Sequence, residues 1–386
     1  MKSINIGQVG YKFMGKAHSN AYRKVGMFFD LPAELKMRAL CGREEEWLKK
    51  SAAQFGWETC ETSWEKLVTR SDIDVIDITA PSNAHKDIAI AAADNGKHIF
   101  CEKPLAINLS DAREMLEAAK KNGVKHQIGF NYRFAPAVVL AKNMIDQGKI
   151  GKIFHVRAYY LQDWIIDPEF PLVWRLDKNV CGSGSLGDLG AHFIDLARYL
   201  VGDMKYVSGM SKTFVEERPL SAQMIGLSGK ADKDAPRGKV EVDDGTVFTA
   251  EFECGALGVF EASRFTQGHK NDLFIEINGE KGSLKFVFER MNELQYYSAD
   301  DSEGLQGFRL IQASESVHPY MSAWWPVGHV IGYEHTFVHE MYEFINAIAN
   351  NTAASPSFED GVKCSQIIEA VELSCQRNAR VEVNSL

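Results

Sequence analysis

The sequence predicts an α/β protein of two domains: a doubly wound parallel sheet, followed by an α+β domain with a large open, mainly antiparallel sheet. Three observations lead to this prediction. Short apolar runs alternate with helical patterns over the first 130 residues. A glycine-containing turn, GYKFMG at 10–15, follows the first apolar run. After about residue 150, strand patterns follow one another, several of them through tight turns.

The first domain is expected over residues 1–129. Its strands are apolar almost throughout, as in a parallel sheet covered on both faces, and several helical patterns end at a glycine. The expected strands cover 4–10, 35–42, 73–81, 97–104 and 125–133, and the expected helices cover 14–29, 44–56, 85–96 and 109–123.

The second domain is expected over residues 130–386, with its junction near 130–135. A broad open sheet leaves one face exposed, so we expect a homodimer or homotetramer through this sheet. The expected strands cover 152–162, 205–215, 245–253, 256–265, 273–280 and 282–289, and the expected helices cover 186–202, 334–350 and 361–376.

Composition narrows the function classes. The 386 residues carry a formal net charge of −9, so no basic field directs the protein to nucleic acid or to anionic lipid. The longest apolar runs are strand-length, too short for a membrane span, and the first residues lead directly into a strand without a signal-peptide pattern. Seven scattered cysteines form no C-x-x-C pair. We therefore expect reduced thiols, a cytoplasmic location and no metal site.

The turn at 10–15 nearly matches the dinucleotide-binding pattern G-x-G-x-x-G. Gly10 and Gly15 are present, but Lys12 replaces the middle glycine, which normally lets the backbone approach a pyrophosphate. Taken alone, the turn fits either a cofactor site or an ordinary strand-to-helix connection. In a cofactor site, either the Lys12 ammonium contacts the phosphates or the contact falls to the backbone at Phe13 and Met14.

The end of the second strand leaves NAD and NADP both open. Gly42 and Arg43 stand where an acidic residue normally binds the adenosine ribose. Arg43 suits a 2′-phosphate or stacking on adenine. Three glutamates at 44–46 would repel that phosphate, but they equally suit a helix N-terminus.

Two later stretches carry residues suited to oxidising an alcohol. In CEKP, Lys103 lies at the carboxyl end of a strand, where its charge can stabilise an alkoxide; the alternative is a surface lysine. In GDLGAHFIDLARYL, Asp188 and His192 are four residues apart and share one face of a helix. They suit the hydroxyls of a polyol, with His192 as the base; the alternative is a surface Asp–His pair.

The ordered stretches IGQVGYKFMG, APSNAH, CEKP, GFNYRF and GSLGDLGAHFIDLARYL resemble the Gfo/Idh/MocA oxidoreductases over the whole chain. The resemblance implies a Rossmann domain that binds NAD, with NADP possible, and a sugar or polyol substrate. It also implies Lys103, Asp188 and His192 as the catalytic set. From these motifs, the further candidates for cofactor binding are Ala80, Pro81, Asn83, His85, Glu102, Asn131 and Arg133.

Within that family the sequence is most similar to the inositol dehydrogenases and to the sugar 3-dehydrogenases that act on levoglucosan and related sugars. LQDW and WWPVGHVIGYEHTF carry the similarity to the sugar 3-dehydrogenases. The expected reaction is NAD(P)-dependent oxidation of a secondary hydroxyl. A redox-neutral glycoside-cleaving or epimerising enzyme and a non-catalytic sugar sensor are the alternatives. Besides the catalytic set, the candidate substrate-binding residues are Gln162, Trp164, Trp325, Tyr333 and His335.

Overall fold

The computed structural model describes residues 3–220, 222–225, 228–231 and 234–386. The chain forms two compact units. The first comprises Met1–Phe134 and Ile331–Ser365, and the second comprises Ala135–Val330 and Gln366–Leu386. The division after Phe134 lies close to the expected junction, but residues 331–365, which we expected in the second domain, pack with the first unit.

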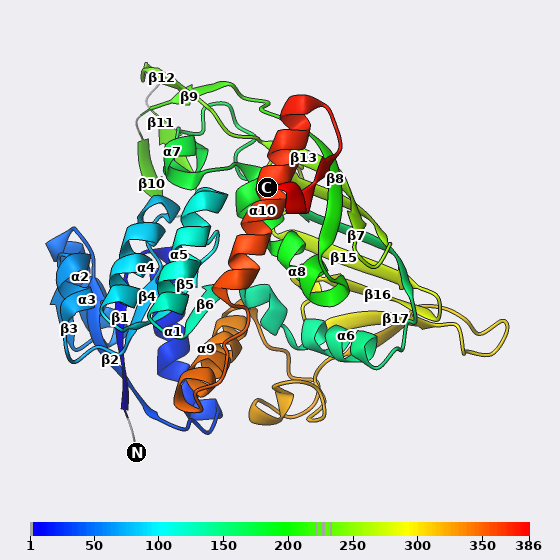
Figure 1. Cartoon of the computed structure of the whole chain (residues 1–386), viewed down its shortest axis with the longest axis horizontal. Coiled ribbons are helices and arrows are strands. Elements are labelled where there is room, and N and C mark those ends of the chain that lie inside the picture. Colours follow the sequence, from blue (N-terminus) through cyan, green and yellow to red (C-terminus); the bar gives the residue numbers. More distant parts are fainter. Residues whose placement is uncertain (1–2, 221, 226–227, 232–233) are drawn as a thin grey trace. The chain divides into compact units, whose positions relative to one another are not determined.

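The first unit is built on a six-stranded parallel sheet with the order β3-β2-β1-β4-β5-β6 (Figure 1). The reversal of strand order next to β1 is the arrangement of a doubly wound fold, so the predicted fold class is confirmed. The strands are β1 (Ser3–Val9), β2 (Glu34–Cys41), β3 (Thr59–Glu61), β4 (Val75–Ile78), β5 (His98–Glu102) and β6 (His126–Gly129).

Helices connect these strands, and one further helix comes from a distant part of the sequence. The short β3 and α3 were not expected, because runs of three and six residues give little periodic signal. The helices are α1 (Phe13–Phe28), α2 (Glu45–Phe55), α3 (Trp64–Thr69), α4 (His85–Asp94), α5 (Leu109–Lys121) and α9 (Tyr333–Ala349).

Helix α9 belongs to the first unit because its apolar face completes that unit's core, and Figure 1 shows it beside α1. Phe337 and Phe344 are at most 1% exposed. The Phe344 ring packs edge-on against Phe100 of β5, with ring centroids 5.5 Å apart. Sequence order placed this helix in the second domain, and burial of its aromatic face places it in the first unit.

The second unit is built on a nine-stranded sheet with the order β18-β17-β16-β15-β7-β14-β13-β8-β19. Its pairings are antiparallel except for β7 with β14, which run parallel. The strands are β7 (Ile153–Leu161), β8 (Met204–Lys212), β13 (Gly245–Phe252), β14 (Leu257–Ser263), β15 (Asp272–Gly279), β16 (Gly282–Val287), β17 (Glu293–Ser298), β18 (Arg309–Gln312) and β19 (Val381–Glu382).

Two short ribbons and several helices accompany this sheet. Strand β9 (Glu217–Pro219) pairs with β12 (Arg237–Lys239), and β10 (Ala222–Ile225) pairs with β11 (Ser228–Ala231). The helices are α6 (Pro136–Asp146), α7 (Lys178–Cys181), the π-helical turn η4 (Leu186–Gly190), α8 (Ala191–Val201) and α10 (Phe358–Arg377), which begins in the first unit.

One face of the large sheet forms the second core. Phe193 of α8 stacks on Phe260 of β14, with ring centroids 5.6 Å apart. Leu189, Leu196 and Leu200 are at most 4% exposed. Along β13 and β14, alternate side chains are exposed, as expected for a sheet with one open face.

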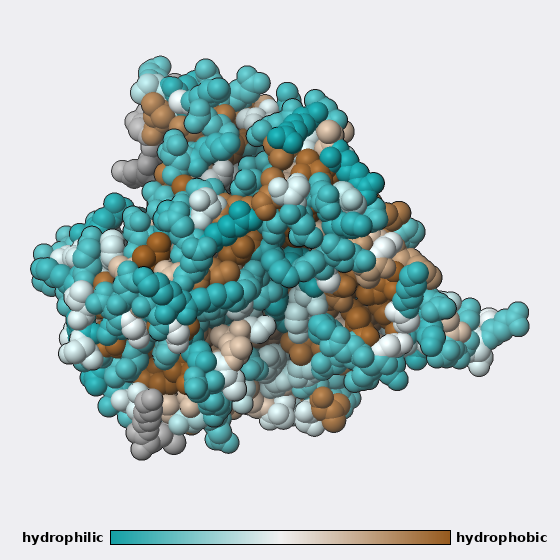
Figure 2. Space-filling view, in the orientation of Figure 1, coloured by the Kyte–Doolittle hydropathy of each residue, from teal (hydrophilic) through white to brown (hydrophobic). Residues whose placement is uncertain are grey.

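Charged and polar side chains cover most of the face seen in Figure 2, with an apolar area where Figure 1 labels β15 and β16. None of the helices formed by the described residues combines the length and apolar character needed to cross a membrane.

Candidate functional site

The turn between β1 and α1 accepts only glycine at two positions. Gly10 has a φ of +112°, and a Cβ added there would lie 2.5 Å from Thr79 Oγ1. A Cβ added at Gly15 would lie 2.2 Å from the carbonyl oxygen of Gly10. The backbone of the first turn of α1 therefore packs directly on the end of β1, as the first and third glycines of a dinucleotide-binding turn allow.

A buried glutamine holds this turn in shape. Gln8 Nε2 donates hydrogen bonds to the carbonyl oxygens of Gly10 and Gly15, at 2.8 and 2.9 Å. Gln8 is 0% exposed. Sequence reasoning missed its role, because a glutamine within an apolar strand has no signature of its own; its position two residues before Gly10 was the only available hint.

The middle position of the pattern does not require glycine. Lys12 is the N-cap of α1 with a φ of −79°, which any L-residue adopts, and its side chain is exposed. Within the described chain no side chain caps this helix, and its first turn contains no acidic residue. The amides at Phe13 and Met14 and the positive end of the helix dipole therefore suit a phosphate group.

The end of β2 also shows why a glycine is needed there. A Cβ on Gly42 would lie 2.2 Å from the ring of Tyr11. Arg43 is exposed next to this contact. Glu45 and Glu46 lie in the first turn of α2, where they complement the helix dipole, the helix N-terminus interpretation that the sequence left open.

In the motif APSNAH, the side chain of His85 lies between the end of β4 and the loop after Lys103. The two ring nitrogens of His85 lie 2.9 Å from the Ala80 carbonyl oxygen and 3.0 Å from the Pro104 carbonyl oxygen. Burial lowers the pKa of His85, so the ring is neutral near pH 7. His85 thus lies between the end of β4 and the loop beside Lys103, and the neutral ring donates to one of these two carbonyl oxygens. Pro81 and Asn83 are exposed.

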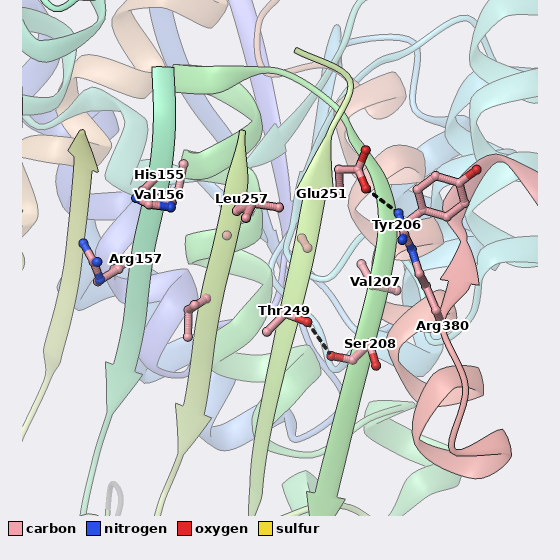
Figure 3. Close-up of a pocket in the computed structure, with 13 residues that line it drawn as sticks. His155, Val156, Arg157, Tyr206, Val207, Ser208, Thr249, Glu251, Leu257 and Arg380 are labelled. Atoms are coloured by element: carbon pink, nitrogen blue, oxygen red, sulfur yellow. Dashed lines mark hydrogen bonds and ion pairs between the residues drawn. The ribbon is translucent and has the colours of Figure 1, made fainter. Parts of the chain in front are cut away.

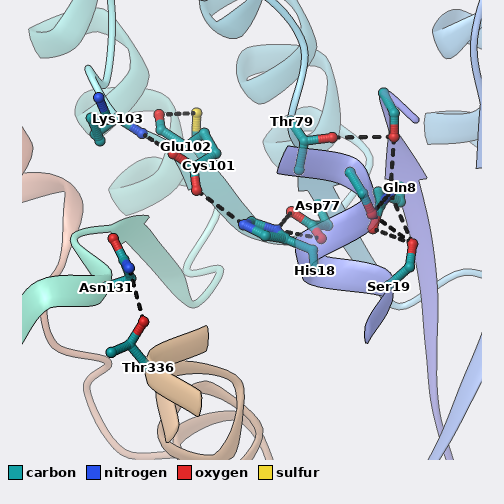
Figure 4. Close-up of polar contacts among 12 residues, drawn as sticks. Gln8, His18, Ser19, Asp77, Thr79, Cys101, Glu102, Lys103, Asn131 and Thr336 are labelled. Atoms are coloured by element: carbon teal, nitrogen blue, oxygen red, sulfur yellow. Dashed lines mark hydrogen bonds and ion pairs between the residues drawn. The ribbon is translucent and has the colours of Figure 1, made fainter. Parts of the chain in front are cut away.

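Glu102, next to Lys103, belongs to a buried polar chain (Figure 4). Its Oε2 accepts a hydrogen bond from the Lys103 backbone N–H at 3.1 Å, and its Oε1 accepts one from His18 Nε2 at 3.0 Å. Burial alone would lower the pKa of His18, but the nearby carboxylates of Asp77 and Glu102 outweigh it and raise the pKa to about 10. The imidazole is therefore an imidazolium ion.

Asn131 and Arg133 connect the segment after β6 to the residues around α9 and α10. Asn131 Nδ2 donates to Thr336 Oγ1 at 2.9 Å (Figure 4), and Arg133 forms an ion pair with Asp360 at 3.0 Å. Both residues are at most 5% exposed. These contacts fit a structural junction within the first unit.

In the second unit, Asp188 lies in the π-helical turn η4 and His192 lies in α8. We expected one continuous α-helix here; π-helical turns of this kind are frequent at functional sites. Asp188 Oδ2 forms an ion pair at 2.9 Å with Arg264, whose side chain is fully buried. Arg264 follows β14 directly, and the sequence alone did not reveal its role.

Aromatic and amide side chains connect Asp188 to His192. The Arg264 guanidinium lies 5.7 Å from the Trp164 ring centroid, and Trp164 Nε1 donates to Gln162 Oε1 at 2.8 Å. The oxygen of Asn271 accepts from Gln162 at 3.1 Å and from the Tyr160 hydroxyl at 2.5 Å. The Tyr160 and His192 rings are 5.8 Å apart. This group is called the β7-end cluster below: Tyr160, Gln162, Trp164, Asp188, His192, Arg264 and Asn271.

Asp243 shapes the glycine-rich stretch that precedes Asp188. Its carboxylate accepts hydrogen bonds from the backbone amides of Gly184 and Leu186, both at 2.9 Å, and from the Ser185 hydroxyl. A Cβ on Gly184 would lie 2.0 Å from the Asp243 carbonyl oxygen. This close packing fixes the start of η4.

The remaining residues predicted from the sequence to bind substrate lie outside the β7-end cluster. Tyr333 and His335 belong to the first unit. Tyr333 stacks on Phe13 with ring centroids 6.4 Å apart, beside the start of α1, and His335 accepts a hydrogen bond from the Gly332 amide at the start of α9. Trp325 is 48% exposed in the second unit. Lys103 lies in the first unit, and Asp188 and His192 lie in the second.

Family models match most of the chain. The model described as an oxidoreductase family with an NAD-binding Rossmann fold matches residues 4–130, and the GFO/IDH/MocA C-terminal domain matches residues 138–285. The levoglucosan dehydrogenase of Pseudarthrobacter phenanthrenivorans is 41% identical over 99% of both chains. The myo-inositol 2-dehydrogenase of Thermotoga maritima is 25% identical, again over 99% of both chains.

Solved structures agree with this match. Levoglucosan dehydrogenase in complex with NADH and levoglucosan has a TM-score of 0.93 at 40% identity, covering 99% of this chain and 100% of that chain. An oxidoreductase domain protein from Kribbella flavida has a TM-score of 0.93 at 48% identity, with the same coverage.

Proposed function

Since the chain belongs to the Gfo/Idh/MocA oxidoreductases, which bind NAD in a Rossmann domain, we propose that it oxidises a secondary hydroxyl of a cyclic sugar, anhydrosugar or polyol. The β7-end cluster is the observation that carries the substrate class. It combines a carboxylate, an imidazole, an amide and an indole. A sugar site needs polar groups that hydrogen-bond the hydroxyls and a flat apolar ring that packs on the C–H groups, and this cluster has both.

The first unit fits the NAD cofactor. Gly10 and Gly15 place no Cβ where the first turn of α1 packs on the end of β1, and the start of α1, which has no side-chain cap, would present its amides to a pyrophosphate. Arg43 would stack on the adenine. When bound, NAD accepts the hydride that leaves the carbinol carbon.

The chain's own residues handle the proton and the developing charge. His192 removes the hydroxyl proton, because an imidazole is an effective base near neutral pH. Asp188, held by Arg264, orients a substrate hydroxyl, and Lys103 stabilises the alkoxide electrostatically. Gln162 provides a further polar contact, and the indole of Trp164 provides an apolar face for sugar C–H groups.

A cofactor-reduction screen tests this function. NAD and NADP are each combined with inositols, glucose, 1,5-anhydro sugars and levoglucosan, and absorbance at the NADH band is followed. Steady NADH formation with one of these sugars supports a dehydrogenase. Product without net NADH supports a redox-neutral enzyme, and sugar binding without turnover supports a sensor.

Single substitutions test the residue roles. His192→Ala and Lys103→Ala should each lower kcat by about 10²- to 10⁴-fold, the usual contribution of an acid–base group. NADH binding, measured by fluorescence titration, should persist. Near-wild-type turnover of His192→Ala would remove the base assignment.

The open sheet face supports a homo-oligomer, as a further part of the proposal. Leu257 and Val259 are 54% and 56% exposed on β14. Both line the same pocket as Arg380 and Glu251, which form an ion pair. Figure 3 shows Leu257 in this pocket with that ion pair. Val259→Asp should shift the protein to a smaller species in analytical ultracentrifugation, whereas an unchanged sedimentation coefficient would point to another interface.

Seven cysteines without a disulfide among the described residues fit a cytoplasmic location.

A further inference from the structure

A buried chain of three ionisable side chains lies behind the backbone of Lys103, and the proposed reaction makes no use of it. His18 of α1 and Asp77 of β4 are 0% exposed, and Glu102 of β5 is 5% exposed. His18 Nδ1 donates to both Asp77 oxygens at 3.0 Å, and His18 Nε2 donates to Glu102 Oε1 at 3.0 Å. Figure 4 shows the imidazole between the two carboxylates.

Stabilisation of the fold does not readily explain why these three ionisable side chains are buried together. Removing three charged groups from water carries a large desolvation penalty, and apolar side chains of similar volume often stabilise a core as well or better. A role in orienting neighbouring groups accounts for the arrangement more directly.

The contacts fix Glu102 in one orientation. Its Oε1 is held by the imidazolium, and its Oε2 is held by the Lys103 amide at 3.1 Å. A Cβ on Gly129 of β6 would lie 2.8 Å from Oε1, so the neighbouring strand leaves space for this carboxylate. The His18 ring itself is fixed by Asp77 and by an edge-on contact with Phe100, with ring centroids 5.3 Å apart.

We propose that His18 is a positioning residue: bridging Asp77 to Glu102, it fixes the carboxylate that binds the Lys103 amide and so places the Lys103 side chain for the reaction. This inference rests on the proposed role of Lys103. The imidazolium keeps Glu102 Oε1 occupied, which leaves Oε2 to accept from the Lys103 N–H. Without His18, the Glu102 carboxylate turns more freely and the Lys103 backbone loses a rigid partner.

Steady-state kinetics with the sugar found in the screen provide the first test. His18→Gln should lower kcat by about 10²-fold, since displacement of a catalytic group by about 1 Å costs that much. KM and the NADH dissociation constant should change less than about 3-fold. Asp77→Asn, which keeps the shape of the site, should lower kcat less, because Glu102 retains its contact with His18.

His339→Gln is the matched control. His339 is also 0% exposed in the first unit, but its Nδ1 lies 2.9 Å from the Phe134 carbonyl oxygen, whereas His18 lies between two carboxylates. It should retain the wild-type kcat at a similar loss of melting temperature. Equal loss of kcat in His18→Gln and His339→Gln, or wild-type kcat in His18→Gln, would overturn the positioning role.

A double-mutant cycle separates this inference from the proposed function. In a Lys103→Ala background, His18→Gln should lower kcat no further, because a residue that acts through Lys103 has no effect without it. A further loss of about 10²-fold in the double mutant would refute the positioning role and leave the role of Lys103 intact. Wild-type turnover in Lys103→Ala alone would instead refute the proposed role of Lys103.

Discussion

Conformational stability should depend on the protonation of His18, and raising the pH is the perturbation that shows it. The pKa is about 10 in the folded protein, against its ordinary value of 6.5. The folded state therefore keeps a proton that the unfolded chain releases above pH 6.5. The stabilisation is complete below pH 6.5 and is lost as the pH rises through about 10.

The magnitude follows from the size of this difference. One proton contributes about 1.4 kcal/mol for each pH unit, so stability should fall by about 5 kcal/mol between pH 6.5 and pH 10. Buried thiols add to this fall above about pH 9, because burial raises the pKa of Cys101 well above its ordinary value and only the unfolded chain then releases that proton. The same holds above about pH 10 for Tyr22, whose pKa burial also raises. Comparison with a His18 variant therefore isolates the part that is due to His18.

The assay compares thermal unfolding of wild type and His18→Gln by circular dichroism from pH 6 to pH 10. The difference in melting temperature between the two proteins should narrow as the pH rises, because only the wild type has the His18 proton to lose. Ionisations common to both proteins cancel in this difference. His339→Gln is the control: burial lowers the pKa of His339 to about 3, so its proton matters only below pH 6.5. A wild-type advantage over His18→Gln that stays constant up to pH 10 would refute the reasoning.

Three further predictions concern the turn between β1 and α1 and the β7-end cluster. Gly15→Ala should weaken NADH binding at least 10-fold in a fluorescence titration, because its Cβ would lie 2.2 Å from a carbonyl oxygen. Gly26→Ala in the same helix, with 3.5 Å of clearance, should bind normally and stabilise by about 0.5–1 kcal/mol. Arg264→Met removes the partner of Asp188 and should cost about 3 kcal/mol in urea unfolding, with a lower kcat/KM; wild-type values would show that the ion pair is dispensable. Lys12→Gly should weaken NADH binding a few-fold at low salt and little at high salt; equal affinity at low salt would assign the phosphate contact to the backbone.

The sequence was sufficient for the features that depend on local pattern. Apolar strands alternating with helices predicted the parallel sheet, since both faces of such a sheet are buried. The glycines at 10 and 15 predicted the turn, since no other residue fits there. The ordered motifs predicted the family and the NAD cofactor, both of which the family models show.

Tertiary structure alone decided which distant residues meet. Helix α9 joined the first unit because its aromatic face fits the core around Phe100. Arg264 reached Asp188 because β14 ends beside η4. His18 came to lie between two carboxylates from different strands. Each of these contacts depends on burial and on pairing between segments 59 or more residues apart, and no local periodicity encodes such pairing.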